Sequence, residues 1–178
     1  MNELKDIKLV VGLGNKGEKY TSTYHNAGQD AVLFITNQIN QKLKKPLLKK
    51  FFITKNQEIT FAFLDCYMNE SGEFLKKLLK YLNLEPSELL LLHDDSDLPI
   101  GEYKLAFGSS SAGHHGVDSS IKYLDTENFW RLRIGIRSET HTNKKAGDFV
   151  LQKTNPSDRK GLENIYQEII KLLGLLSR

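Results

Sequence analysis

The stretch LLLLHDDSDLP, residues 89–99, joins a continuous apolar run to an acidic segment. Four consecutive leucines without alternation predict a short strand that is covered on both faces, as central parallel strands are. The acidic residues follow directly and would therefore lie at the carboxyl end of this strand. Because ligands of α/β sheets bind outside the carboxyl ends of parallel strands, residues 93–99 are a candidate pocket.

Apolar segments on both sides of this stretch predict the rest of a sheet. Further strands are expected at residues 7–13, 51–54, 59–64, 103–107 and 129–136. Helical spacing predicts one helix over residues 27–43 and a second that begins after Asn69 as N-cap and ends at 82. A third helix is expected to end near residue 124, and a fourth to begin at Pro156. The predicted hairpin at 51–64 makes the sheet mixed. Alternating strands and helices, without repeats or linkers, predict a single α/β domain over residues 1–178.

The composition is that of an ordinary globular protein, with 39% hydrophobic and 26% charged residues in a chain of 178. No apolar run approaches the roughly 18 residues that span a bilayer, and the first residues lack the pattern of a secretory signal. The single cysteine, Cys66, excludes an intrachain disulfide and is expected to be a buried structural thiol. We therefore expect a cytoplasmic protein without a membrane partner.

The net charge of +3 is too small to identify a nucleic-acid partner. Basic residues nevertheless cluster, with lysines at 42, 44, 45, 49, 50 and 55 and arginines at 131, 133 and 137. Taken alone, such clusters are more often solvated helix ends and loops than binding sites.

Gly12-Leu13-Gly14-Asn15-Lys16-Gly17 matches the spacing of a dinucleotide-binding loop after a predicted strand. That function requires a helix that begins inside the motif, so that its N-terminus faces the pyrophosphate. Here polar residues 18–26 intervene before the helical pattern starts. The glycines are therefore expected to turn the chain and present the following loop, and nucleotide binding is disfavoured.

That loop carries Asn15, Tyr20 and His25, and the strand at 89–92 would deliver Asp94 to the same edge of the sheet. A carboxylate beside an imidazole fixes its tautomer and stabilises the imidazolium that forms when it accepts a proton. No serine or cysteine is placed as a nucleophile, so water would attack. Three alternatives stay open: a structural histidine, a cation held by aspartates 94, 95 and 97, and a zinc site at His114 and His115, the last disfavoured because adjacent side chains diverge.

Five blocks of the sequence carry a further signal. The first combines Gly12-Leu13-Gly14-Asn15-x-Gly17, Tyr20 and His25-Asn26-Ala27-Gly28. The other four are Tyr67-Met68-Asn69-x-Ser71-Gly72, His93-Asp94-x-x-Asp97-Leu98-Pro99-x-Gly101, Gly113-His114-x-Gly116 and residues 131–136. In these blocks and in their order, the chain resembles bacterial peptidyl-tRNA hydrolases. Together the blocks cover about residues 7–151. Each block alone is modestly specific, but their order and spacing together are highly specific.

The resemblance implies a monomeric three-layer α/β/α sandwich around a twisted mixed sheet, and a metal-independent ester hydrolase without a cofactor. It implies that His25 is the catalytic base and Asp94 its orienting partner, and that Asn15 helps to distinguish peptidyl-tRNA from aminoacyl-tRNA. Further implied contacts to the 3′ end, the peptide and the acceptor stem of tRNA are Tyr20, Tyr67, Asn69, Lys104, Arg131 and Arg133. The enzyme would thereby return tRNA to translation.

Departures from the family pattern concern the same pocket. His115 stands where the family has an asparagine that contacts substrate, so His115 is a candidate substrate-binding residue of altered affinity or pH dependence. Lys16 replaces a usual proline, which is expected to loosen the loop. A relative that binds RNA without catalysis and a nucleotide-dependent enzyme are the competing hypotheses; the intact His25 and Asp94 favour a hydrolase.

Overall fold

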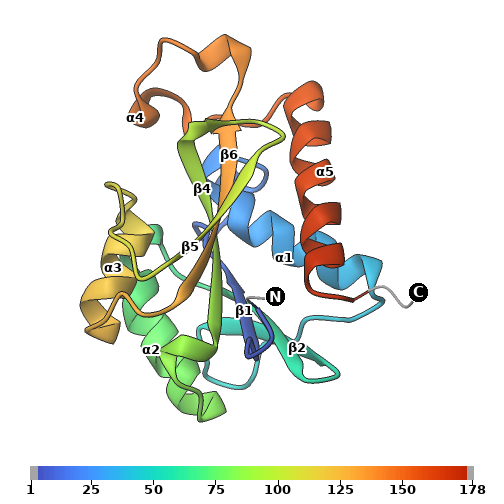
Figure 1. The fold of residues 1–178 in the computed structure, drawn as a ribbon, viewed down its shortest axis with the longest axis vertical. Helices are drawn as coiled ribbons and strands as arrows, with labels where there is room; N and C mark the ends of the chain where they lie inside the picture. The colour runs from blue at the N-terminus through green and yellow to red at the C-terminus, as the bar shows by residue number, and fades with distance from the viewer. Residues whose placement is uncertain (1–3, 176–178) are drawn as a thin grey trace.

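The structure is a computed structural model that describes residues 4–175. The predicted single domain, residues 1–178, therefore extends three residues beyond the described part at each end. A six-stranded sheet lies between helices (Figure 1). Its strands are β1 Leu9–Gly12, β2 Phe51–Asn56, β3 Ile59–Leu64, β4 Leu89–Pro99, β5 Tyr103–Phe107 and β6 Trp130–Arg137. The α-helices are α1 Ala27–Gln38, α2 Ser71–Leu82, α3 His115–Leu124, α4 Ala146–Phe149 and α5 Pro156–Leu172.

The sheet is mixed, in the order β2-β3-β1-β4-β6-β5. The four inner strands are parallel, since β1 pairs with β3 and β4, and β4 pairs with β6. The two edge strands are antiparallel to their neighbours. The hairpin β2–β3 and the central place of residues 89–92 were both predicted from the sequence, and the α/β class with a mixed sheet is confirmed.

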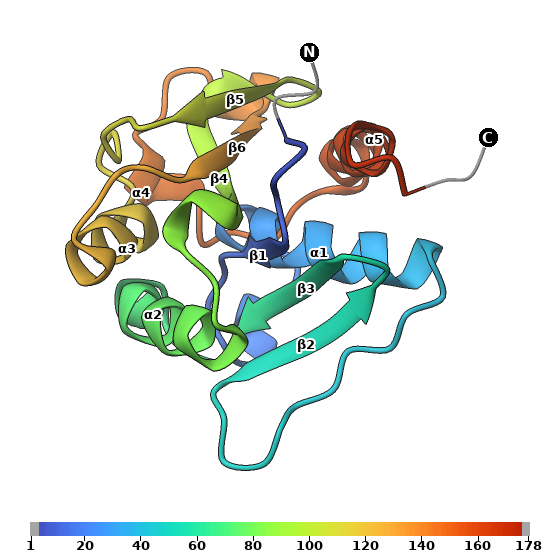
Figure 2. The same ribbon diagram turned by 60° about the horizontal axis from the view of Figure 1, so that its bottom comes forward.

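Helices cover both faces of the sheet, with α1 and α5 on one side and α2 and α3 on the other (Figures 1 and 2). Alternate residues of one strand enter opposite cores: Leu90 and Leu92 pack with α1 and α5, whereas Leu89 and Leu91 pack with α2 and α3. All four leucines are fully buried. Two buried faces explain why residues 89–92 show no polar alternation.

Several predicted boundaries were wrong. The strand β4 continues through residues 93–99, which were expected to follow the strand as a pocket segment. The helix α1 ends at Gln38 and not near residue 43. Asn69 is not an N-cap, because it lies inside a 3₁₀ turn, Met68–Glu70, that precedes α2. Hydrogen bonding decides these ends, and apolar spacing does not report it.

Among the described residues 4–175, no helix is both long and apolar enough to cross a membrane.

Candidate active site

The first turn of α1 lies directly against the sheet, because two glycines allow it. A Cβ on Gly28 would stand 2.2 Å from the carbonyl oxygen of Leu92, and one on Gly12 would stand 2.1 Å from that of Gly28. Neither contact leaves room for a side chain. The close approach sets the N-terminus of α1 beside the middle of β4, where Asp94 follows Leu92 by two residues. The α-helix begins only at Ala27. It therefore does not start inside the glycine-rich loop, as the sequence predicted.

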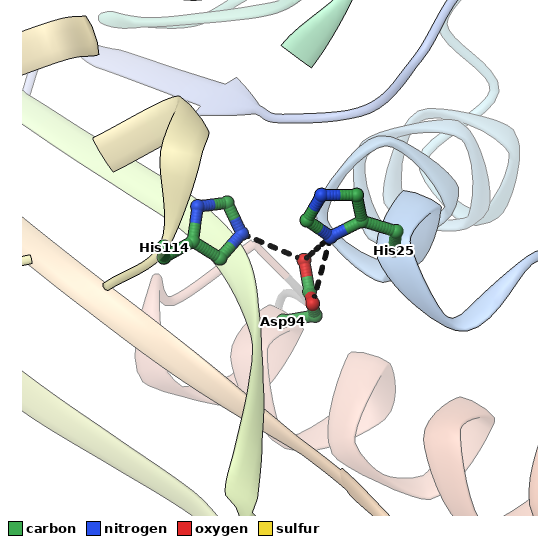
Figure 3. A group of neighbouring side chains, drawn as sticks. All are labelled: His25, Asp94 and His114. Atoms are coloured by element: carbon green, nitrogen blue, oxygen red, sulfur yellow. Dashed lines mark hydrogen bonds and ion pairs between the residues drawn. The ribbon is translucent and has the colours of Figure 1, made fainter. Parts of the chain in front are cut away.

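His25 and Asp94 meet at this contact (Figure 3). The Nδ1 atom of His25 lies 2.9 Å from both carboxylate oxygens of Asp94, although the residues are 69 positions apart. The side chain of Asp94 is 3% exposed and that of His25 is 12% exposed. With Nδ1 donating to the carboxylate, Nε2 of His25 is the free acceptor. Both residues line one cavity of about 170 Å³. The imidazole and its acidic partner therefore share a pocket, as the functional hypothesis requires.

His114 binds the same carboxylate from the opposite side (Figure 3). Its Nε2 lies 2.8 Å from Oδ1 of Asp94. Its Nδ1 accepts the backbone N–H groups of Gly116 and Val117 at 3.1 and 3.2 Å and thereby caps α3. An atom that accepts two N–H groups carries no proton, so Nε2 carries it and donates to Asp94. His114 is held as one neutral tautomer. The sequence analysis identified its block and weighed a zinc site at His114 and His115, but it did not predict that His114 binds Asp94.

The charges of this cluster follow from burial and pairing. Burial by itself would raise the pKa of Asp94, but the neighbouring His114 and His25 outweigh it and hold that pKa well below its usual range. For His25, burial lowers the pKa, and the Asp94 carboxylate more than offsets this, so the net shift is upward. Burial drives the pKa of His93 far down. The site thus contains a fixed carboxylate, one basic imidazole and two neutral ones.

Within residues 4–175, His25, Asp94 and His114 are a group whose ligand atoms lie close enough to hold a metal ion, within 4.8 Å of one another. The tautomer of His114 opposes this use. A neutral imidazole that binds a metal through Nε2 carries its proton on Nδ1. That proton would face the N–H groups of Gly116 and Val117, which need an acceptor. The donor set therefore fits a hydrogen-bonded cluster better than a metal centre.

Asn15 is buried and held from three sides. Its backbone N–H donates to Oδ1 of Asn26 at 2.9 Å, and Nδ2 of Asn26 donates to its carbonyl at 3.0 Å. Its side-chain Oδ1 accepts the N–H of Met68 at 2.9 Å. The remaining amide group, Nδ2, is the one available to donate. The neighbouring Lys16, which was expected to loosen this loop, donates its N–H to the carbonyl of Cys66 at 2.9 Å, a bond that proline cannot form.

Three predicted substrate contacts lie on the loop of Asn15 and on the segment around Met68 that Asn15 binds. Tyr20 and Tyr67 meet edge to face with ring centroids 6.3 Å apart, and Tyr67 is 44% exposed. Asn69 is exposed, and its carbonyl accepts the hydroxyl of Ser119 at 2.9 Å, so α3 supports the turn that presents it. The structure thus brings these loops together, although none of these residues lines the cavity at His25.

The predicted phosphate contacts divide into two kinds. Lys104 is exposed, and Arg133 lines the cavity, where its Nε donates to Oδ2 of Asp95 at 2.5 Å. Arg131 is only 2% exposed, and its Nη2 donates to both Ser109 and the carbonyl of Ser110. A guanidinium occupied under a loop has little surface to offer a phosphate. Residues 131 and 133 share one face of β6, and the loop at Ser109 and Ser110 covers Arg131.

His115 begins α3 and is exposed on the wall of the cavity. Cys66, in contrast, is 1% exposed, and burial raises its pKa to about 12, which suits the structural thiol that was predicted. The sequence did not identify Ala146, Gly147 and Val150 as cavity residues. Backbone bonds from His25 to the carbonyl of Val150, at 2.8 Å, and from Tyr24 to that of Gln152, at 3.2 Å, draw this distant segment to the site.

Comparisons with known proteins identify the family that this chain resembles. The sequence model of a family described as peptidyl-tRNA hydrolase matches residues 9–178. The peptidyl-tRNA hydrolase of Haemophilus influenzae is 36% identical over 182 positions, covering 98% of this chain and 92% of the relative. That of Mesoplasma florum is 38% identical over 162 positions, covering 89% and 85%. The crystal structure of the Acinetobacter baumannii peptidyl-tRNA hydrolase superposes with a TM-score of 0.83 at 26% identity, covering 93% of this chain and 86% of that one.

Proposed function

Because this chain belongs to the peptidyl-tRNA hydrolase family, we propose that the cavity around His25 and Asp94 is where it hydrolyses the ester between a peptide and the 3′ end of tRNA. The reaction releases free tRNA from peptidyl-tRNA. The observation that carries the site assignment is the pair of 2.9 Å contacts between Nδ1 of His25 and the carboxylate of Asp94 inside one cavity.

His25 acts as the general base in this proposal. Its Nε2 takes a proton from a water molecule while the water oxygen attacks the ester carbon. The imidazolium that forms is stabilised by the Asp94 carboxylate, which is itself held by His114. When the tetrahedral intermediate collapses, the bond to the 3′ oxygen breaks and the imidazolium returns the proton to that oxygen. An ester needs less activation than an amide, so one base and a preorganised pocket suffice.

Asn15 reads the peptide in this proposal. Its Oδ1 is already used by the N–H of Met68, so Nδ2 can donate only to an acceptor such as a substrate carbonyl. A peptidyl group offers the carbonyl of its N-acyl group next to the ester, whereas an aminoacyl group ends in a charged amine, which donates. The fixed amide therefore favours peptidyl-tRNA over aminoacyl-tRNA.

The surrounding side chains bind the nucleic acid. Tyr20 or Tyr67 stacks on the unpaired 3′ adenosine. Asn69 and His115 contact the 3′ end of the tRNA and the peptide joined to it. Lys104 and Arg133 neutralise phosphates of the acceptor stem. We assign Arg131 a different role, in which it supports the loop at Ser109 and Ser110. We further propose that the chain works as a monomeric single domain in the cytoplasm.

The test is release of free tRNA from N-acetyl-aminoacyl-tRNA by the purified protein. We expect turnover that a metal chelator leaves unchanged, loss of turnover in His25→Ala, and strong reduction in Asp94→Ala. The aminoacyl-tRNA with a free amine serves as the matched control substrate and should be cleaved far more slowly. Binding of the substrate without turnover by the unaltered protein would contradict the proposal.

A further inference from the structure

Residues 41–50 and helix α2 form a strongly basic part of the surface. They carry eight lysines and one carboxylate, Glu73, although the whole chain has a net charge of only +3. Figure 2 shows the segment between α1 and β2 extending away from the sheet, on the side where β2 lies. Charge that is concentrated in this way, in a nearly neutral molecule, attracts a polyanion to one face.

Four of these lysines line a groove of about 560 Å³, which we call the lysine groove. It lies between the segment before β2 and the C-terminal half of α2 and is lined by Leu48, Lys49, Lys50, Phe51, Phe74, Lys77, Lys80 and Tyr81. One wall contributes Lys49 and Lys50, and the other contributes Lys77 and Lys80. It shares no lining residue with the cavity at His25.

Aromatic rings hold two of the ammonium groups in place. The Nζ of Lys49 lies 5.2 Å from the ring centroid of Tyr81, and that of Lys77 lies 4.9 Å from that of Phe74. Lys77 also pairs with Glu73. Lys50 and Lys80 are exposed and form no ion pair with the described residues. The groove therefore has two lysines held by aromatic rings, Lys49 and Lys77, and two whose ammonium groups are free to bind a ligand, Lys50 and Lys80.

We propose that the lysine groove binds backbone phosphates of the tRNA substrate at a distance from the ester. This inference rests on the proposed function. Lysines on two facing walls suit a strand of phosphates that runs between them, whereas a flat anionic surface would contact one side. The helix α2 begins beside Asn69, a proposed substrate contact, and its 12 residues extend about 18 Å along one wall of the groove. A ligand that contacts both sites must be longer than the few nucleotides nearest the ester. A tRNA is long enough.

The test compares two substrates that share the same reacting end. One is full-length N-acetyl-aminoacyl-tRNA, and the other is the same N-acetyl-aminoacyl group on a CCA trinucleotide. In Lys50→Gln/Lys80→Gln we expect the KM for tRNA to rise about three- to tenfold with kcat unchanged, because two phosphate contacts are lost. The slope of log kcat/KM against log salt should fall by about one to two. Kinetics on the trinucleotide should not change.

The matched control is Lys160→Gln/Lys171→Gln, which removes two charges from α5 on the other face of the sheet. It should leave the KM for tRNA within about twofold of the unaltered enzyme. Equal losses on both substrates, or the same loss in the control variant, would overturn the proposal. Inactivity of the unaltered enzyme on both substrates would instead refute the proposed function, so the two failures are distinct.

Leu47 and Leu48 are 87% and 94% exposed beside these lysines, and such a pair can also insert into an anionic membrane. Vesicles of 30% phosphatidylserine in phosphatidylcholine test this occupant by co-sedimentation. Binding that Lys50→Gln/Lys80→Gln abolishes, together with an unchanged KM for tRNA, would replace RNA by a membrane surface. No binding to vesicles, together with the raised KM, supports the tRNA contact.

Discussion

At the scale of single residues, the Asp94 carboxylate sets the pH at which His25 works as a base. It raises the pKa of His25 above the ordinary value of 6.5, so His25 is protonated and inactive at lower pH. We expect kcat/KM to fall as the pH drops through a value above 6.5. In Asp94→Asn the anion is gone and burial remains. The pH at which kcat/KM falls, which is the acidic limb of the pH-rate profile, should therefore move below 6.5.

The same variant should lose activity on the order of 100-fold or more, because the amide stabilises the imidazolium poorly. A pH-rate profile on N-acetyl-aminoacyl-tRNA measures both effects. If Asp94→Asn loses activity while its acidic limb stays in place, Asp94 does not act through His25.

His115 is predicted to affect substrate binding and not the base. It is exposed on the cavity wall and makes no hydrogen bond to Asp94, whose two partners are His25 and His114. We expect His115→Asn to lower KM by roughly threefold, the worth of one added hydrogen bond, with the acidic limb unmoved. Measuring KM across the pH range decides this. A displaced limb at unchanged KM would contradict the assignment.

At the scale of elements, the docking of α1 on the sheet places the base. Gly28→Ala would put a Cβ 2.2 Å from the carbonyl oxygen of Leu92, and a strand backbone cannot yield without breaking its ladder. We expect about 2 kcal/mol lower free energy of unfolding and a large loss of kcat, because His25 moves with the helix. Gly147→Ala is the control for stability, since nothing lies within 4 Å of its added Cβ. Denaturant titrations of the two variants should therefore differ.

Arg137 connects the end of β4 to the wall of the cavity formed by α4. Its Nε donates to the carbonyl of Ser96, and its Nη1 donates to those of His141 and Lys144. We expect Arg137→Ala to cost about 2 kcal/mol and to lower kcat, since the following segment holds the backbone of His25 through Val150. Arg137→Lys keeps the charge but not the fork, so it should restore little of either. Full recovery in the lysine variant would show that charge alone matters.

At the scale of the whole molecule, a carboxylate between α1 and α5 makes stability depend on pH. Burial raises the pKa of Asp30 to about 7, above its ordinary 3.8, although Arg159 opposes the shift. The folded state therefore binds a proton that the unfolded state lacks between these values, and stability falls as the pH rises from about 4 to 7. Asp30→Asn removes this loss.

We expect thermal unfolding to show that Asp30→Asn is stabilised relative to the unaltered protein at pH 8 compared with pH 5, by about 2 to 3 kcal/mol. The exposed Asp118→Asn is the control and should follow the unaltered protein at both values. The same gain at pH 5 and pH 8 would show that Asp30 is already ionised at pH 5.

The sequence by itself determined the α/β class, the central strand at residues 89–92 and the pairing of His25 with Asp94 as a hypothesis. These follow from periodicity and from the order of elements, because burial on one or both faces leaves a local pattern in the chain. The hairpin at 51–64 could be predicted from the sequence for the same reason. The edge of the sheet where polar loops gather follows from strand direction alone.

Only the tertiary structure decided how these residues meet. The proton on His114, the burial of Arg131 and the contact of Gly28 with Leu92 each depend on how distant segments dock. His25 and Asp94 are 69 positions apart, and His114 lies 20 positions beyond Asp94. Hydrogen bonds need atoms within about 3 Å in the right direction. Local spacing records whether a side chain is buried, but not which atom it faces, so that information exists only once the layers have packed.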